Sequence, residues 1–474
     1  MVKKPHVVIL GGGPAGIGAA YQVTKKNLAS VTVIEQENDV GGIAGSFNIS
    51  GINVDYGSHR LHPACDPEIL RDLQMLLGNE LMERPRHGRI RLRNRWIHFP
   101  LKPLDLALKL PFSFSISTAI DLARKNLGFR QKTFDTESFA GVLESGLGRT
   151  ICREFYFPYV HKLWGLLPEE ISPTQAHRRV SANSLKKMLQ KILGAVPGFK
   201  QPGSGFFFYP RKGFGQITRA MATAARQAGA EIRLQTAIRA IRLGPPHCIK
   251  LEHNGQITSI QADYVWSTIP LHVLPRLVQP AAPSEVLEAS RRMRSRAMVL
   301  IYFVLGQPRF SEYDAHYFPG PESWLTRLSE PKNYSARTDP SDRTVLCGEL
   351  PCDVDDETWR MSDEVLAGVV RQSLDRCGLP IGAPVLSVTT RRLAHAYPIY
   401  RCGYEECFRV IHQWLSGLDG VLSFGRQGLF AHDNIHHTLA MAYAAASCLQ
   451  QSASFDSEQW QVHRDEFENY VVED

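Results

Sequence analysis

A glycine-rich turn between two apolar runs near the N-terminus constrains the fold of this chain more than any other feature. The run His6–Leu10 leads into Gly11-Gly12-Gly13-Pro14-Ala15-Gly16, a helical pattern covers residues 17–24, and a second apolar run covers residues 30–35. Strand, glycine turn, helix and strand in this order predict a βαβ unit, the start of a Rossmann-type α/β domain.

Each glycine of this G-x-G-x-x-G pattern has a chemical reason. Gly11 allows the tight turn, Gly13 lets the backbone approach a pyrophosphate, and Gly16 lets the helix pack closely on the strand. The N–H groups at the start of the helix favour phosphate. Glu35 ends the second strand, where a carboxylate accepts ribose hydroxyls. The pattern predicts a dinucleotide site without separating FAD from NAD; its residues are Gly11, Gly13, Pro14, Ala15, Gly16, Glu35 and Gln36.

Length and composition favour a globular protein of two or three domains. The chain has 474 residues, of which 43% are hydrophobic and 21% charged. We expect a cytoplasmic protein without a spanning helix, with its nine cysteines reduced. The formal charge of +7 suits an anionic cofactor, substrate or membrane surface. Recognisable nucleic-acid motifs and metal-ligand clusters are absent, so neither nucleic acid nor metal is expected.

The residues after the βαβ unit resemble segments of FAD-dependent amine oxidases and their relatives. The run from Glu35 through Gly41-Gly42-Ile43-Ala44-Gly45-Ser46 resembles their E-x(6)-G-G-x-x-x-(S/T) pattern. The run from Asp55 to His62 resembles the D-x-G-x-H-x-x-H segment of UDP-galactopyranose mutases and protoporphyrinogen-oxidase-like proteins. The resemblance implies non-covalent FAD and catalytic roles for His59 and His62, with capping or surface positions as the alternative. It places Gly42, Ile43, Ala44, Gly57, Ser58 and His59 at the cofactor.

Later segments resemble further cofactor-contacting runs of the same proteins. Thr268 lies in a strand-ending (S/T)-x-P run, and Ile238 lies on a strand that matches the one contacting adenine. The stretch from Ser423 to His437 resembles a C-terminal G-R-x-G…N-x-D-H segment, in which the arginine contacts the diphosphate and a helix N-terminus stabilises the reduced ring. The residues added by this resemblance are Ile238, Thr268, Gly425, Arg426, Asn434 and Ile435.

Other segments resemble the substrate-binding parts of the mutases. Tyr159 and Trp164 stand in a Y-x-x-K-x-W-G run. Arg178 matches a phosphate-binding arginine, although Arg179 fits a slipped alignment, and Arg294 matches a second one. Surface or structural arginines are the alternative. The predicted substrate residues are Tyr159, Trp164, Arg178, Arg294, Tyr397 and His432, of which the two arginines are also predicted to be catalytic.

Two departures from the mutases bear on the reaction. Phe430 and His432 stand where we expect hydroxylated tyrosines, and His436 stands where relatives carry Asp. We therefore favour an FAD-dependent oxidoreductase of the amine oxidase, protoporphyrinogen oxidase or desaturase type, which moves a hydride between a substrate C–H or C–N bond and flavin N5. A redox-neutral isomerase of a nucleotide sugar is the alternative, and a non-catalytic flavin-binding module is the third possibility.

The pattern as a whole predicts an α/β fold in three parts. Residues 1–70, 206–270 and 415–450 would form a discontinuous FAD-binding domain of the GR2 type. Residues 71–205 would form a mostly helical cap with a ribbon near residues 89–99, and residues 271–414 a β-sheet substrate domain for a small anionic or lipophilic molecule. Residues 451–474 would be an acidic, peripheral tail. The basic amphipathic stretch 101–129 predicts peripheral membrane contact or a helix over the core.

Overall fold

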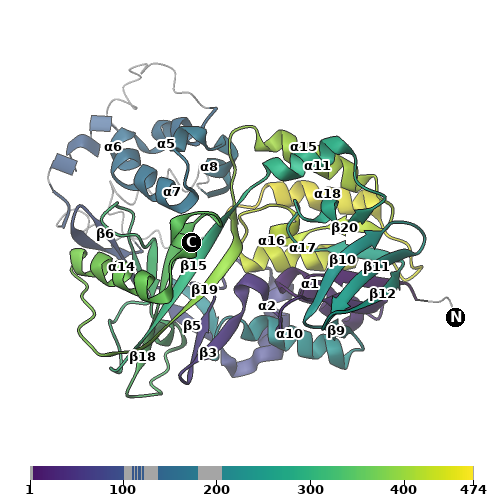
Figure 1. Ribbon diagram of the computed structural model, residues 1–474, viewed down its shortest axis with the longest axis horizontal. Coiled ribbons are helices and arrows are strands. Elements are labelled where there is room, and N and C mark those ends of the chain that lie inside the picture. Colours follow the sequence, from purple (N-terminus) through teal and green to yellow (C-terminus); the bar gives the residue numbers. More distant parts are fainter. Residues whose placement is uncertain are drawn as a thin grey trace.

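The computed structural model describes residues 4–100, 109–111, 113–114, 116–118, 120–121, 137–179 and 205–472. They form two halves side by side, one built on a parallel sheet and one on a long, mostly antiparallel sheet (Figure 1). Most of the amphipathic stretch 101–129 lies outside the described residues. Among the described residues, no helix combines the length and the apolar composition needed to cross a bilayer.

The βαβ unit predicted from the glycine turn is present. Strand β1 (His6–Leu10), helix α1 (Pro14–Lys25) and strand β2 (Ser30–Ile34) follow one another, and the two strands pair in parallel. Both strands are almost entirely buried, as in a parallel sheet covered on both faces. The helix begins at Pro14, earlier than predicted, because proline fits the first turn of a helix.

Three more strands complete a five-stranded parallel sheet of order β20-β13-β1-β2-β9. They are β9 (Glu231–Arg233), β13 (Tyr264–Ser267) and β20 (Val421–Ser423). Helix α1 packs between α10 (Gln216–Gln227) and α17 (Ile435–Ser447) on one face of this sheet. The strands come from three distant stretches of chain, so only tertiary contacts bring the sheet together.

The other face of this sheet is covered by a smaller sheet and two helices. The smaller sheet contains β10 (Thr236–Arg242), β11 (His247–His253), β12 (Gln256–Ala262) and β14 (Val278–Gln279), and the helices are α11 (Ser284–Arg292) and α15 (Tyr404–Ser416). The single strand predicted over residues 231–241 is wrong. Gln235 has a φ of 51°, and this left-handed residue divides the stretch into β9 and β10.

The second half contains a seven-stranded sheet of order β19-β15-β18-β17-β16-β6-β7. Its strands are β6 (Gly88–Leu92), β7 (Arg95–Phe99), β15 (Ser295–Leu305), β16 (Ala315–Tyr317), β17 (Arg327–Ser329), β18 (Thr344–Cys352) and β19 (Val385–Pro398). Helix α14 (Asp363–Arg376) covers one face of β15, and the hairpin β3 (Ser46–Ile49) and β4 (Ile52–Asp55) covers the other. This hairpin brings the loop after Asp55 against the sheet.

The helical region predicted between the two sheets is present in its described part. Helices α5 (Phe139–Leu147), α7 (Phe157–Trp164) and α8 (Pro173–Arg179) pack around one apolar cluster at the upper left of Figure 1. Helix α2 (Pro67–Leu77) lies instead against α10, and β5 (Leu81–Pro85) pairs with β8 (Phe206–Pro210). The predicted ribbon forms β6 and β7 and joins the seven-stranded sheet through β16.

The C-terminal tail is not peripheral, contrary to the prediction. Helix α18 (Ser457–Glu468) packs on α17, and Phe467 and Arg464 on it are buried. The spacing of Trp460 and Phe467, seven residues apart, gives this polar helix an apolar stripe. Beyond the helix, Val472 N–H donates to the carbonyl of Arg178 at 2.8 Å. The chain therefore returns towards the boundary between the two halves, where Figure 1 marks its C-terminal end.

Candidate functional site

The glycine turn after β1 forms an open cradle. Gly11 has a φ of 103°, and a Cβ on Gly16 would lie 2.0 Å from the Gly11 carbonyl oxygen, so the protein itself requires both glycines. A Cβ on Gly13 would meet nothing within 4 Å. Pro14 and Ala15 begin α1, whose first turn has no capping side chain. The turn therefore offers backbone N–H groups and space to a ligand.

Two further segments border this cradle. Glu35 is buried and accepts Gly12 N–H at 2.6 Å, and its burial raises the pKa of its carboxyl group. Gln36 beside it is exposed. The glycine pair after it forms a 3-10 turn, Gly42–Ala44, which includes Ile43. A Cβ on Gly42 would lie 3.5 Å from the Gly13 Cα, so the two glycine turns face each other.

Residues distant in sequence from the glycine turn also border the cradle. Thr268 Oγ1 donates to the carbonyl of Leu10 at 2.9 Å. Gly425 opens the short helix α16 (Gly425–Gly428), and a Cβ there would lie 2.5 Å from the Ala15 Cβ. Ile238, on β10, is partly buried against the core that backs β1. Thr268, Gly425 and Ala15 therefore meet at the carboxyl end of the parallel sheet, where α/β sheets bind ligands.

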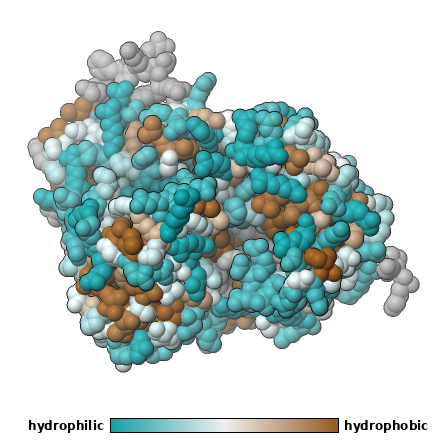
Figure 2. Space-filling model, viewed as in Figure 1, coloured by the Kyte–Doolittle hydropathy of each residue, from teal (hydrophilic) through white to brown (hydrophobic). Residues whose placement is uncertain are grey.

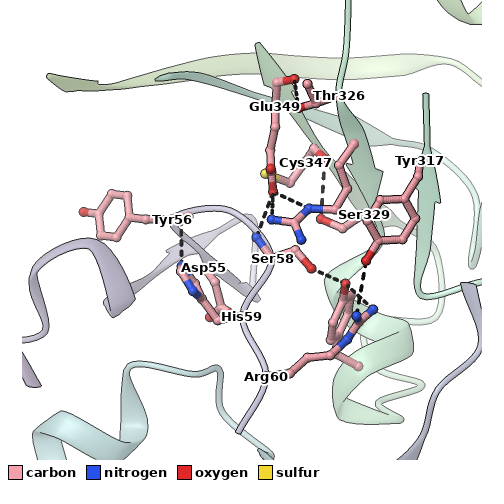
Figure 3. A network of polar contacts seen from close by, with 12 residues as sticks. Asp55, Tyr56, Ser58, His59, Arg60, Tyr317, Thr326, Ser329, Cys347 and Glu349 are labelled. Atoms are coloured by element: carbon pink, nitrogen blue, oxygen red, sulfur yellow. Dashed lines mark hydrogen bonds and ion pairs between the residues drawn. The ribbon is translucent and has the colours of Figure 1, made fainter. Parts of the chain in front are cut away.

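The loop after β4 is fixed by a buried ion pair that the sequence did not reveal (Figure 3). Gly57 has a φ of 92°, and the next N–H, of Ser58, donates to Glu349 Oε1 at 2.9 Å. Glu349 also pairs with Arg327 at 2.8 Å. Arg327 and Glu349 lie opposite each other on β17 and β18 and are 22 residues apart, so no local sequence pattern predicts their contact.

His59, in this loop, is a partly buried, neutral imidazole. Its Nε2 lies 2.9 Å from the carbonyl of Tyr56, and its ring stacks on Phe214 at 5.4 Å. Burial lowers the pKa of His59 to about 4, so it carries no charge near pH 7. Asp55 before it is structural, because its carboxylate accepts hydrogen bonds from Ser46 and Tyr209, both at 2.6 Å.

His62 combines the two predicted possibilities. Its Nδ1 accepts the N–H of Ala64 at 3.1 Å, as a turn-capping histidine does. Its ring also lies 6.0 Å from that of His436, on the first turn of α17. It therefore connects the loop after β4 with the helix N-terminus predicted to face the flavin.

Most of the predicted substrate residues converge at the boundary between the two halves. The ring of His432 lies 5.8 Å from Trp164 and 6.0 Å from Tyr397, and Tyr397 lies 5.1 Å from the guanidinium of Arg426. Tyr159 packs against the same apolar cluster as Trp164 and Tyr397. Helix α7, strand β19 and the segment before α17 thus bring four aromatic side chains together, and we call this packed group the aromatic pocket: Tyr159, Trp164, Tyr397 and His432.

Charged groups lie beside the aromatic pocket. Arg178, on α8, is largely buried and makes no ion pair with any described residue. Asp433 is 3% exposed, and neither carboxylate oxygen accepts a hydrogen bond from a described residue. Burial raises the pKa of Asp433 to about 6, although Arg178 and Arg426 oppose the rise. The side chain of Arg179, the alternative to Arg178, lies outside the described residues.

Comparison with known proteins identifies the family. Residues 14–412 match the family of flavin containing amine oxidoreductases. This chain belongs to that family. Its cofactor is therefore a flavin, and the dinucleotide cradle indicates FAD.

Similar proteins include oxidases and a mutase. Coproporphyrinogen III oxidase of Bacillus subtilis (strain 168) is 21% identical over 456 residues, which cover 89% of this chain and 93% of that protein. Polyamine oxidase 5 of Oryza sativa subsp. japonica is 33% identical over 79 residues, which span only 17% of this chain and 16% of that protein.

Solved structures share the fold at low identity. Reduced UDP-galactopyranose mutase has a TM-score of 0.81 at 20% identity, covering 99% of this chain and 100% of that one. Wild-type putrescine oxidase bound to putrescine has a TM-score of 0.65 at 15% identity, covering 94% and 98%. At these identities the likeness establishes the flavin amine oxidase-like fold and no specific reaction.

The cradle of this flavin amine oxidoreductase fits FAD. The open space at Gly13 and its approach to Gly42 leave room for a diphosphate between two glycine turns. Asn434 precedes α17 without a side-chain cap, so the first N–H groups of this helix, which begins at Ile435, are directed at the same boundary. The Arg426 guanidinium donates to the carbonyls of Asp433 and Ala396, which fixes the segment leading into α17.

Two predicted positions of this flavoprotein are wrong. Arg294 is not in the aromatic pocket: its side chain is 67% exposed and lies 3.8 Å from Asp353. Strand β15 begins one residue later, so Arg294 lies outside the sheet. Arg296 lies inwards instead, with its side chain 10% exposed, 2.8 Å from Asp353. A Cβ on Gly165, the residue after Trp164, would lie 2.8 Å from the guanidinium of Arg296.

Phe430 also lies elsewhere than predicted. Its ring packs in the core between Tyr400 and Tyr404, with centroids 5.9 and 6.3 Å away. The missing hydroxyl at this position therefore has no bearing on a ligand. Of the two positions where hydroxylated tyrosines were expected, only His432 lies in the aromatic pocket.

Proposed function

We propose that this protein is an FAD-dependent oxidoreductase that moves a hydride between a C–H or C–N bond of a small substrate and flavin N5, with FAD held without a covalent link. The family supports the class of enzyme. FAD, when bound, supplies the two-electron chemistry, and the protein supplies orientation and an enclosed pocket.

The observation that carries this choice is the charge beside the aromatic pocket. Arg178 is the one guanidinium there without a carboxylate or carbonyl partner among the described residues, and Asp433 lies close to it. One free guanidinium suits a substrate that presents a single carboxylate or similar group, because a second negative charge would lie unpaired near Asp433. Trp164 and Tyr397 would supply stacking area for its apolar part.

A redox-neutral isomerase acting on a nucleotide sugar is the second candidate. The aromatic pocket favours it, because Tyr159, Trp164 and Tyr397 suit a flat base and a sugar ring. Charge disfavours it. A diphosphate needs at least two cationic partners, and the second predicted arginine, Arg294, is exposed at the surface.

The two candidate reactions differ in whether the flavin gains or loses electrons in each turnover. Protein reduced with dithionite is mixed anaerobically with UDP-galactofuranose, and the formation of UDP-galactopyranose is followed. Oxidised protein is mixed anaerobically with 4-aminobutyrate, an amine with one carboxylate, or with putrescine, the matched diamine without a carboxylate that a relative's name gives, and flavin absorbance is followed. We expect bleaching without isomerisation, and expect Arg178→Met to abolish it. Repeated isomerisation without electron consumption would favour the mutase. If neither reaction occurs, that result would favour a non-catalytic flavin-binding module.

Location in the cell is a separate proposal. We expect a cytoplasmic enzyme, with peripheral membrane contact through residues 101–129. On the face shown in Figure 2, apolar side chains gather in separate patches on both halves instead of one continuous band. The contact is tested by cosedimentation with anionic vesicles at low and at high salt. An equal bound fraction for a variant with Lys102 and Lys109 changed to Gln would contradict the contact.

A further inference from the structure

A row of imidazoles connects the loop after β4 with the buried carboxylate of Asp433. The rings of His62 and His436 lie 6.0 Å apart, and those of His436 and His437 lie 4.1 Å apart. His437 Nδ1 then lies 3.7 Å from Asp433 Oδ1. We call these four residues the histidine row. Its inner end adjoins Arg178 and the aromatic pocket, and its outer end, His62, is partly exposed.

The histidine row is enclosed along its inner part. His436 is 4% exposed, and the ring of Tyr470 from the C-terminal tail stacks on His437 at 4.5 Å. Val472 holds the tail in place through its bond to the carbonyl of Arg178. Tyr470 and Val472 therefore cover the inner part of the histidine row.

Packing alone does not explain this arrangement. Burying the His436 imidazole and the Asp433 carboxylate costs free energy unless each is fully hydrogen-bonded, yet neither Asp433 oxygen has such a bond among the described residues. A neutral imidazole has one N–H donor and one acceptor nitrogen, so it can take a proton on one side and release one on the other. Polar groups in a row therefore suit proton transfer better than they suit a core.

We propose that His62, His436, His437 and Asp433 form a proton path between the aromatic pocket and solvent. The inference rests on the proposed oxidoreductase function. Oxidation of a substrate that loses one C–H and one N–H or O–H hydrogen transfers the C–H hydrogen with two electrons to FAD and leaves the other hydrogen as a proton. That proton passes to Asp433, then to His437, His436 and His62, and then to water.

The electrostatic surroundings make the first transfer reversible. The groups that face Asp433 are Arg178 from α8, Tyr400 after β19, Arg426 from α16, His437 from α17 and Tyr470 from the tail. Burial raises the pKa of Asp433 to about 6 and lowers that of His437 to about 4, with His62 and Arg178 also lowering the latter. The transfer from Asp433 to His437 is uphill by a factor of about 100, which thermal motion crosses readily.

Proton release can be timed without knowing the substrate. Protein with bound FAD is reduced with dithionite, freed of reagent, and mixed in weak buffer with ferricyanide and a pH indicator. Two ferricyanide ions remove two electrons, and the anionic reduced flavin, which would lie beside the inner end of the histidine row, would release its single N5 proton into that row, so one proton appears per flavin. In the wild type we expect the proton to appear together with the flavin colour. In His436→Gln and in the more exposed His62→Gln, we expect it to lag by about tenfold or more, with added imidazole restoring the rate.

His253→Gln, an exposed histidine on β11, is the matched control and should behave as the wild type. Simultaneous proton release in both row variants would overturn the proposal. A lag that imidazole does not shorten would also overturn it, because a merely structural defect would give that result.

A second readout needs neither FAD nor turnover. Protein labelled with ¹³C in the histidine rings is titrated by NMR, and the His437 signal is assigned from its loss in His437→Gln. Near pH 6, where Asp433 ionises, the His437 signal should shift in the wild type while its ring stays neutral, and Asp433→Asn should remove this shift. A wild-type His437 signal that does not change near pH 6 would mean that the two groups are not coupled, and would overturn the path at that step. If the protein binds no FAD, the proposed function fails, but this titration still decides whether Asp433 and His437 are coupled.

Discussion

Replacing Gly13 separates the needs of the fold from the needs of the cofactor. Gly13 has a φ of −72° and a ψ of −179°, which any residue adopts, and a Cβ there would meet nothing within 4 Å. Gly13→Ala should therefore leave the apoprotein as stable as the wild type or more stable by roughly 0.4–1 kcal/mol, through reduced freedom of the unfolded chain. If the diphosphate occupies that space, the same methyl group collides with it.

The expected cost to binding follows from the collision. Forcing an extra methyl group into a packed site costs about 1–3 kcal/mol, so FAD should bind roughly 5- to 150-fold more weakly to Gly13→Ala. Gly13→Val should bind no measurable FAD. Gly16→Ala is the matched control, because its Cβ would lie 2.0 Å from the Gly11 carbonyl oxygen and should destabilise the fold itself.

Two measurements on each variant decide the matter: the melting temperature of the apoprotein, and the dissociation constant for FAD from flavin fluorescence. The reasoning predicts a stable fold with weak FAD binding for Gly13→Ala, and loss of both for Gly16→Ala. Wild-type FAD affinity in Gly13→Ala would refute it, because the cofactor then does not approach the backbone at this turn.

Three further predictions concern charged groups. Burial raises the pKa of Asp433 from 3.8 to about 6, so ionisation of this carboxyl group costs stability as pH rises through that range. Asp433→Asn should therefore gain roughly 2 kcal/mol on the wild type between pH 4 and pH 8, seen as a widening gap in melting temperature, and a constant gap would contradict this. Arg296→Ala should lose the ion pair with Asp353, destabilise the protein by roughly 1–3 kcal/mol and lower its melting temperature. Arg294→Ala should change the melting temperature little, and equal effects of the two substitutions would argue against the placement of these side chains. Glu35→Gln should weaken FAD binding about tenfold or more, measured by the same fluorescence titration. An unchanged affinity would mean that the carboxylate only accepts the N–H groups of Gly12 and Glu37.

The N-terminal part of the fold was predictable because its signals are local. Glycines, a buried strand on each side and a helix between them fall within 35 residues, and the structure follows them closely. The division of β9 from β10 was not predictable, because a single left-handed Gln235 causes it and glutamine gives no turn signal. The joining of β6 to β16 depends on a pairing between residues more than 220 apart, such as Gly88 and Ala315.

The tail shows how composition misleads when it is read without periodicity. Its acidic and polar residues favoured a peripheral segment, but Trp460 and Phe467 fall on one side of α18, and Tyr470 follows the helix; all three pack inwards. Tyr470 then reaches His437 beside the candidate site. The aromatic spacing was present in the sequence and would have predicted the helix.

Prediction of the candidate site divides in the same way. Resemblance to known flavoproteins located Trp164, Tyr397 and His432, which the structure brings together. It also gave Arg294 as a substrate residue, but this residue precedes β15 and its side chain is 67% exposed, which the resemblance alone does not reveal. The Arg327–Glu349 pair escaped prediction, because only the register of β17 and β18 makes them neighbours.

The most direct test of the central claim is the flavin content of the purified protein. The absorption spectrum of freshly purified protein should show a bound flavin, and denaturation should release FAD intact, close to one per chain, identified by chromatography against FMN and riboflavin. A colourless protein that takes up no FAD on incubation would contradict the claim that Gly11, Gly13, Gly16 and Glu35 form an FAD cradle.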